Sequence, residues 1–366
     1  MRKFRRLFRS VPDPRAANAW HDLLEIVFIA LVAVLCGAEG ASDMAEFGKA
    51  KEELLRRMLR LEHGIPSHDT FSRVFRELDP RAFEQAFRRF LAAFAKANGI
   101  DLTGIVAIDG KALRGAYERG ASATPLHMVN VWAVGARMVL AQCKAPGRNE
   151  VLGALEALEL VSLHGCTVTA DALHCHRAFA AKVLTRGGNY VLALKENQSA
   201  LFADAIGLFR RGGKRSVAKH LEPSTHDRRE WRRATVVRNT SMATKHRFPG
   251  IAAVARVTCR RRVQDSRGEP FVRYFLLSKY MSAKRVLQIT RSHWSIENQL
   301  HWVLDVVFDE DGNRARKDNG PENLAILRAM ALNVLRSHPS RISMRQKVKR
   351  AGWDDAFMLS MVSQMR

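Results

Sequence analysis

The sequence predicts an α/β protein in which an all-helical N-terminal domain precedes a mixed β-sheet core that carries a largely β insertion. Apolar residues recur at helical spacing from residue 20 to about residue 98. Runs rich in β-branched residues then alternate with helical runs up to about residue 198. Strand-like, strongly basic runs follow, before a long helical segment. We therefore expect domains at 1–98 and 99–338, the insertion at about 199–280, and a basic C-terminal tail at 339–366.

The helical unit contains three recognisable segments. The most apolar run, Ile26–Gly37, is 12 residues long, whereas a membrane-spanning helix needs about 20, so we expect a buried helix and no membrane partner. Ser67 is the expected N-cap of the next segment, and Asp79-Pro80 starts another that ends near Asn98. Two interpretations stay open for this unit: a docking or dimerisation bundle, or a helix-turn-helix DNA reader with the Ser67–Leu78 helix in the groove.

The core shows the order β-β-β-α-β-α-β along the chain. Its strand-type runs end in glycine turns or in polar residues, and the helical runs between them contain no proline. This order predicts a mixed sheet with covering helices. The runs are GIVAIDGKALRGA, HMVNVWAVG, RMVLAQCKA, EVLGALEALELV, GCTVTADAL, CHRAFAAKVLTRGG and NYVLALKEN.

The charge of the chain indicates a polyanionic partner. Its 366 residues include 60 Lys+Arg and 36 Asp+Glu, which gives a formal net charge of +24. Such a surplus makes nucleic acid the first partner to consider, although ribosomal and membrane-surface proteins share it. The five cysteines are scattered without a CxxC pair, so we expect neither a disulfide framework nor a zinc ribbon, and a reducing cytoplasm.

Three acidic residues are candidates for chemistry. Asp109 and Asp171 lie at the ends of expected strands, and Glu297 lies in the long helical segment after the insertion. Any one of them alone is more simply a residue that closes a strand or caps a helix. Side by side, such carboxylates repel each other unless a cation lies between them. Oxygen ligands of this kind suit Mg²⁺ or Mn²⁺, and metal ions of this kind can act on a phosphodiester.

Two lysines and two tryptophans are open to either a DNA-binding or a purely structural role. Lys111 and Lys195 follow expected strand ends and are either phosphate contacts or solvated turn lysines. Trp294 and Trp302 either stack on bases or belong to the core.

Histidines also cluster near the candidate acids. His293, Glu297 and His301 share one helix face, but no HExxH motif is present and a zinc site is not expected. His174, Cys175 and His176 follow just after Asp171. Adjacent side chains on a helix point in different directions, so these three are not expected to form a joint metal site.

Four motifs carry a resemblance to a known family. They are AIDGKALRGA, VTADALHCHR, NYVLALKENQ and RSHWSIENQLHWVLDVVFDEDGNRARKDNGPENLAILRAMALNVLR. By these motifs the chain resembles the H-repeat-associated insertion-sequence transposases, which are DDE enzymes with an RNase H-like core, from about Leu23 to Arg336. The resemblance implies an RNase H-like mixed sheet and a catalytic, metal-binding triad of Asp109, Asp171 and Glu297 for Mg²⁺ or Mn²⁺. It also implies double-stranded DNA as partner, both element ends and target, and a homo-oligomer on DNA.

The sequence departs from one signature of related transposases. Where those enzymes carry Tyr, Arg and Lys around the catalytic Glu, this chain carries Thr290, His293 and Leu304. Neighbouring residues are therefore expected to handle DNA instead. Together with the strand-end lysines and the arginines of the insertion, the expected DNA contacts are Lys111, Lys195, Arg228, Arg229, Arg232, Arg233, Arg291, His293, Trp294, Asn298, His301 and Trp302.

The insertion carries nine Lys and Arg between Arg210 and Arg233, against three acidic residues. A solvated face is the simpler interpretation, but like charges at this density repel each other and a polyanion would relieve that cost. By the resemblance the segment interrupts the core between Asp171 and Glu297. We therefore expect it to clamp the DNA backbone beside the scissile phosphate. The basic residues are Arg210, Arg211, Lys214, Arg215, Arg228, Arg229, Arg232 and Arg233, with Lys219 between them.

The function that follows is metal-dependent DNA strand cleavage and strand transfer in the bacterial cytoplasm, in association with the nucleoid. No P-loop is present and no organic cofactor is expected. Two alternatives stay open: a structure-selective nuclease on the same core, and a catalytically idle DNA-binding remnant.

Overall fold

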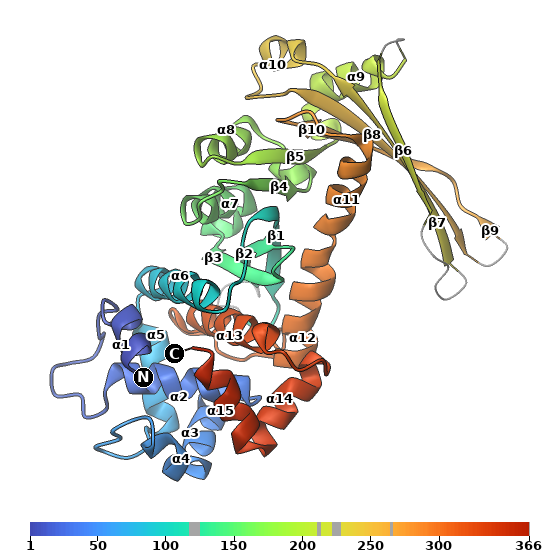
Figure 1. Cartoon of the computed structure of the whole chain (residues 1–366). Helices are drawn as coiled ribbons and strands as arrows, with labels where there is room; N and C mark the ends of the chain where they lie inside the picture. Colours follow the sequence, from blue (N-terminus) through green and yellow to red (C-terminus); the bar gives the residue numbers. More distant parts are fainter. Residues whose placement is uncertain (117–124, 211–213, 222–227, 264–265, 366) are drawn as a thin grey trace.

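The protein is built around a ten-stranded mixed sheet in the order β3-β2-β1-β4-β5-β10-β8-β7-β6, with β9 paired to β8 (Figure 1). The structure is a computed structural model that describes residues 1–116, 125–210, 214–221, 228–263 and 266–365. The strands are β1 (Gly104–Leu113), β2 (Leu126–Ala133), β3 (Met138–Lys144), β4 (Cys166–Ala170), β5 (Asn189–Leu194), β6 (Ser216–Leu221), β7 (Arg228–Arg238), β8 (Ala253–Val263), β9 (Ser266–Arg267) and β10 (Phe271–Leu277).

The first five strands form an RNase H-like sheet. Strands β1, β2 and β3 pair antiparallel, whereas β1, β4 and β5 pair parallel. The connections between the parallel strands contain helices α7 (Glu150–Glu159) and α8 (Arg177–Thr185), as parallel pairing requires. The predicted order β-β-β-α-β-α-β and the predicted fold class are confirmed.

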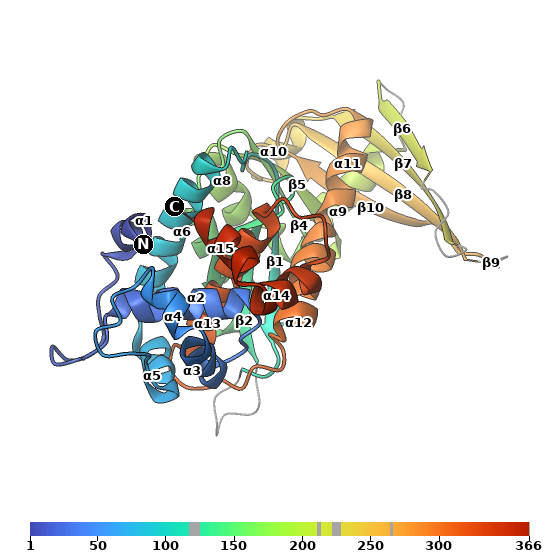
Figure 2. The same ribbon diagram turned by 60° about the horizontal axis from the view of Figure 1, so that its bottom comes forward.

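The insertion extends this sheet. Strand β10 pairs antiparallel with β5, and β8, β7 and β6 follow outward. These outer strands form an arm that projects from the core (Figures 1 and 2). The arm also carries α9 (Ser199–Leu208) and α10 (Ser241–Lys245).

Helices cover the sheet on both faces. On one face, α7 packs on β2 and β3, and α8 packs beside it on β5. On the other face, α11 (Ala283–His293) crosses β1 and β4 and reaches β6, β7 and β8 (Figure 1). A six-residue π-helix, η4 (Ile296–His301), continues α11 and leads into α12 (Trp302–Phe308). Short 3₁₀ turns are η1 (Pro146–Arg148), η2 (Ala172–His174) and η3 (Glu196–Gln198).

The N-terminal unit is helical, as predicted. Ser67 caps α5 by accepting a hydrogen bond from the Thr70 amide, and Asp79 caps α6 through the Arg81 amide. Its helices are α1 (Arg2–Phe8), α2 (Leu23–Leu35), α3 (Ala41–Ala50), α4 (Glu52–Arg56), α5 (His68–Glu77) and α6 (Pro80–Ala97).

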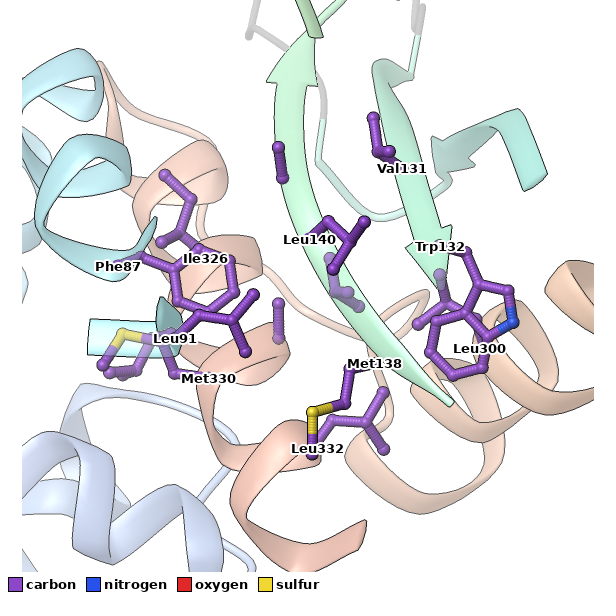
Figure 3. Close-up of a cluster of buried hydrophobic side chains, with 14 of the residues drawn as sticks. Phe87, Leu91, Val131, Trp132, Met138, Leu140, Leu300, Ile326, Met330 and Leu332 are labelled. Carbon is purple, nitrogen blue, oxygen red and sulfur yellow. The ribbon is translucent and has the colours of Figure 1, made fainter. Parts of the chain in front are cut away.

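Helix α13 (Gly320–Ser337) joins this helical unit to the sheet, because it packs against α2, α5 and α6 as well as β3. The buried Asn333 side chain bonds both the amide and the carbonyl of Val139 in β3, each at 2.9 Å. At the other end of α13, the buried Asn323 donates to the carbonyls of Phe75 and Leu78. Figure 3 shows apolar side chains of α6 and α13 packed beside β3.

The segment predicted as a basic tail contains two helices, α14 (Met344–Trp353) and α15 (Asp355–Ser363). Their apolar faces are buried, with Val348 and Ala351 in α14 and Met358 and Met361 in α15. The helical spacing of these residues explains the packing. Among the described residues, no helix is both long and apolar enough to cross a membrane.

A buried cation ties β1 to the chain that follows the π-helix. The Lys111 ammonium lies 2.6 Å from an Asp305 carboxylate oxygen in α12, 3.2 Å from Asp311 and 3.5 Å from Glu310. Burial alone would lower the pKa of Lys111, but these carboxylates outweigh it and raise the pKa above its ordinary value. The first strand and the end of the Glu297-bearing helical segment are thereby held together.

We expect Lys111→Met to destabilise the protein by about 2–4 kcal/mol, because it leaves the buried Glu310 and the partly exposed Asp305 and Asp311 without their cation. Urea unfolding measures this loss. Arg114→Ala is the matched control, since Arg114 contacts the same Asp311 at 3.5 Å but is 81% exposed. A Lys111→Met protein as stable as the control would contradict the ionic role of this residue.

Candidate active site

The parallel pairing of β1 and β4 brings the two candidate aspartates to one place. Ile108 in β1 is paired with Ala170 in β4, and Asp109 and Asp171 are the residues that follow them. Asp171 directly follows β4, as predicted. The prediction that Asp109 ends its strand is wrong, because β1 continues to Leu113 and pairs Asp109 with Asn130 in β2. The Asp171 carboxylate accepts a hydrogen bond from the Leu173 amide at 2.9 Å, which fixes it at the start of η2. The backbone register, rather than any loop, therefore sets the relative position of these carboxylates.

Glu297 lies on the π-helix. The wider turn leaves Ile296 and Leu300 buried while Glu297 stays exposed. π-turns are rare in proteins, and those that occur are often found at functional sites. The Trp132 indole in β2 donates to the Ser295 hydroxyl at 3.2 Å.

A half-buried arginine from α13 supports the same turn. Arg336 donates to the carbonyl of Gln299 within the π-helix, and its guanidinium lies 4.8 Å from the centre of the Trp132 ring. Leu300, from the π-helix, packs near Trp132 (Figure 3). The unusual turn is thus braced from both the sheet and α13.

The carboxylates interact electrostatically. Burial, followed by the negative charges of Glu150, Asp171 and Glu297, raises the pKa of Asp109 to about 8. Burial also raises the pKa of Glu297. Asp109 is thus close enough to the other two acids that the sequence singled out for their charges to affect its pKa.

This donor set suits a hard divalent cation, because oxygen ligands that repel each other are stabilised by one. The fit rests on donor type and charge. Within the described ranges, no three His, Cys, Asp or Glu side chains are arranged as a ready metal-ligand group.

Glu150 is a fourth carboxylate at the site, which the sequence analysis missed. It is the first residue of α7, and its Oε1 lies 3.1 Å from Nε2 of the buried His174. Gly110 makes its approach to β1 possible, because a Cβ at that position would lie 2.3 Å from the Glu150 carboxyl carbon. The glycine after Asp109 was the only signal in the sequence, and it does not say which residue fills the space.

His301 connects Asp109 to a buried polar chain. Its Nδ1 lies 3.8 Å from Asp109 Oδ2, and its Nε2 lies 3.5 Å from the Asn130 amide nitrogen. Gln142 donates to the Asn130 oxygen at 2.6 Å. Burial, with the nearby Lys111 charge, lowers the pKa of His301 to about 4, so its imidazole is neutral at pH 7.

Three of the expected DNA contacts, His293, His301 and Lys111, differ electrostatically from exposed cations. His293, like His301, has its pKa lowered to about 4 by burial, so neither histidine offers a positive charge to phosphate at neutral pH. Lys111 is 7% exposed and already surrounded by carboxylates, so its ammonium faces the protein interior instead of a ligand. Lys111 and His301 have polar partners within the fold, whereas Nδ1 of His293 is buried without a hydrogen-bond partner among the described residues.

Other expected DNA contacts gather in a groove of about 870 Å³ between the arm, α11 and the β2–β3 turn. Arg291 lies 3.0 Å from the His220 ring, and Arg273 stacks over Trp294 at 5.4 Å. The residues that carry its charge and polarity are Arg137, Glu230, Arg232, Arg261, Arg291, Trp294 and Asn298. We call it the inner groove.

The remaining expected contacts lie outside this groove. Lys195 is exposed at the end of β5, and Trp302 is 57% exposed on α12. Arg229 and Arg233 are exposed on the other side of β7. Arg211 lies outside the described residues, as does the side chain of Arg228.

Comparisons with known proteins agree with this fold. Residues 101–334 match the family described as "Transposase DDE domain", and residues 5–91 match the model described as "DDE_Tnp_1-associated". The chain is 28% identical over 366 residues to "H repeat-associated putative transposase YhhI" of Escherichia coli (strain K12), with 96% of each chain covered.

Two further proteins are similar. "Putative transposase YncI" of Escherichia coli O157:H7 is 32% identical over 335 residues, which cover 89% of this chain and 85% of that protein. A solved structure of the piggyBac transposase synaptic complex with hairpin DNA has a TM-score of 0.45 and 12% identity, and covers 100% of this chain and 77% of that one. Because the DDE-domain match extends over most of the chain and the helical N-terminal unit matches the associated model, this protein belongs to the H repeat-associated family of DDE transposases.

Proposed function

We propose that this transposase cleaves DNA at the ends of its element and joins the cleaved ends to target DNA, with Asp109, Asp171 and Glu297 as the catalytic carboxylates. The observation that supports the proposal most is that the negative charges of Asp171 and Glu297, together with that of Glu150, raise the pKa of Asp109, which lies on an inner strand of the RNase H-like sheet. Hydrolysis and transesterification of a phosphodiester need the same in-line geometry, so one site serves both steps.

The three carboxylates would hold Mg²⁺ or Mn²⁺, which supplies activation of the attacking oxygen and charge stabilisation of the leaving oxygen when bound. The residues around the site set the protonation and the direction of the carboxylates that would bind the ion. Asp109 has to lose the proton that its surroundings favour, and the neutral His301 beside it leaves the positive charge to the bound ion. The Leu173 amide keeps Asp171 directed, and the braced π-helix presents Glu297.

The DNA backbone would lie along the inner groove. Arg232, Arg261 and Arg291 line it, and guanidinium groups match phosphate geometry. Lys195 and Trp302 are exposed and extend the contact surface towards the sheet edge and α12. We expect the enzyme to act as a homo-oligomer on two element ends, in the cytoplasm where such DNA is present.

We expect Asp109→Asn, Asp171→Asn and Glu297→Gln each to lower strand cleavage by at least about 10³-fold, because each removes a charge that the metal requires while it preserves shape. Cleavage and joining of labelled element ends with Mg²⁺ or Mn²⁺ and a supercoiled target measure the effect.

Binding of the same DNA should change by less than about twofold, which separates chemistry from affinity. Asp69→Asn, at an 87% exposed position, is the matched control. Full activity in any of the three variants would remove that residue from the catalytic set, and cleavage without joined product in the unmutated enzyme would instead identify a nuclease.

The pKa of Asp109 also predicts a pH dependence of stability. The folded pKa of about 8 lies above the ordinary value of 3.8, so the stability that this group contributes is present below pH 4 and is lost as pH rises towards 8. In EDTA, the Tm of Asp109→Asn minus the Tm of the unmutated protein should therefore increase from pH 4 to pH 8.

The same experiment has a metal arm. Adding Mg²⁺ or Mn²⁺ at pH 8 should raise the Tm of the unmutated protein and have a smaller effect on Asp109→Asn, because bound cations stabilise only the folded carboxylate site. A Tm difference that stays flat across this pH range would show that Asp109 is not held in a proton-favouring environment.

A further inference from the structure

The arginines of β7 do not share one face. Successive side chains of a strand point to opposite sides of a sheet, so Arg232 faces one side while Arg229 and Arg233 face the other. The side of Arg232 is the one that α11 covers, because Ala234 and Val236 of β7 pack with residues of α11. This side leads into the inner groove. We call the opposite side of β6, β7, β8 and β10 the outer face.

The outer face is basic and has no acidic side chain at its described strand positions. Lys219, Arg229, Arg233 and Arg260 are all exposed there, and none has an ion-pair partner among the described residues. On the inner side, by contrast, Arg232 is paired with Glu230 at 2.8 Å. The positive charge of the outer face is therefore the less neutralised of the two.

The arrangement of these charges is costly for an isolated sheet. Lys219 in β6 is paired in register with Arg233 in β7, and like charges directly opposite each other destabilise a sheet. Apolar side chains lie between the cations and are also exposed: Trp231 at 38%, Leu221 at 56% and Val272 at 47%. Leu221, Trp231 and Arg260 form one row across three strands.

Only the part of this face nearest the core is covered by a helix of the described chain. Tyr274 in β10 contacts Phe202 and Phe209 around α9, and Arg256 stacks over Phe209 at 5.0 Å. Farther out, towards the projecting ends of β7 and β8, no helix of the described chain covers this face (Figure 1). The exposed surface is thus the projecting part of the arm.

We infer that the outer face of the arm binds a second duplex of DNA, separate from the DNA in the inner groove. The inference rests on the proposed function, which places the first duplex in that groove. A straight duplex that contacts one side of a sheet cannot reach the other, because the strand layer and its side chains, about 10 Å thick, lie between them. DNA on both basic faces therefore requires two segments.

The charge pattern favours a duplex over a small anion. The cations are distributed over three neighbouring strands, which lie about 4.8 Å apart, and they do not converge on one point. Such a spread suits the regularly spaced phosphates of a duplex backbone, whose counterions are released on binding. Because these cations are placed to reach phosphates along a backbone, we assign target DNA, which is bound without a fixed sequence, as the second duplex. Capture of an element-end duplex in strong preference to a random one would overturn this assignment.

A bridging experiment tests the inference. The full-length protein is bound to a biotinylated 30-base-pair random duplex on beads, and capture of a second, fluorescent random duplex is measured. The variant K219Q/R229Q/R233Q/R260Q should keep its affinity for the first duplex within about threefold but lose capture of the second at least tenfold. The salt slope of capture should flatten by roughly 0.9 for each lost phosphate contact.

Controls separate charge, folding and function. K96Q/R341Q/R345Q/K349Q removes the same number of exposed charges elsewhere and should capture the second duplex normally. The Tm of the quadruple variant shows whether it is folded. If it is not, the double variant R229Q/R233Q takes its place and should lose part of the capture of the second duplex.

Each outcome has a defined meaning. Unchanged capture by the outer-face variant, equal loss in the control variant, or capture by the unmutated protein of single strands only would overturn the inference. Binding of one duplex without any capture of a second would overturn it as well, while leaving the proposed function intact. Failure to bind even the first duplex would contradict the proposed function itself.

Discussion

The ammonium of Lys111 is the contact on which the geometry of the site depends. It lies two residues after Asp109 on β1 and is surrounded by carboxylates of α12 and the chain after it. The strand that carries the first candidate acid is thereby joined to the helical segment that carries the last. Desolvated charges of this kind add little net stability, but removing one partner is severe. The ionic cluster therefore enforces position more than it contributes to stability.

The carboxylates of the candidate site repel one another. Parallel pairing of β1 and β4 places Asp109 beside Asp171, and the tight approach of α7 across Gly110 adds Glu150. Each additional carboxylate makes the ionised form of Asp109 less favourable. Such repulsion is typical of sites that are completed by a cation. The surrounding core, with α13 between the sheet and the helical unit, supplies the stability that tolerates it.

Much of this could be predicted from the sequence, because strand and helix periods are local. The runs around Asp109 and Asp171, the caps Ser67 and Asp79 and the order of the core elements all follow from nearby residues. Contacts between distant segments could not be predicted this way. Nothing near Glu150 indicates that it approaches Gly110, and nothing near Lys111 indicates carboxylates some 200 positions later.

In the arm, the sequence did not show on which face of the sheet each arginine lies. The arginines of β7 were expected to act together because they are close in the sequence, yet the pleat distributes them between two faces. The density of charges along a chain does not tell which face each charge occupies; that depends on where the strand begins and on its register. The same limit applies to His293 and His301, whose shared helix face could be predicted but whose burial could not.

The π-helix at Glu297 makes this protein sensitive to the loss of a single residue. A π-turn holds one more residue than an α-turn, so deleting a single codon within Ile296–His301 would restore an ordinary α-helix. Removing Asn298 would take away no buried core residue, and α12 would keep its place, because an α-turn needs one residue fewer to reach it. The change would fall on the wide turn itself, so the direction of the Glu297 side chain would differ. An in-frame deletion of one codon would therefore leave the fold intact and displace the candidate catalytic glutamate.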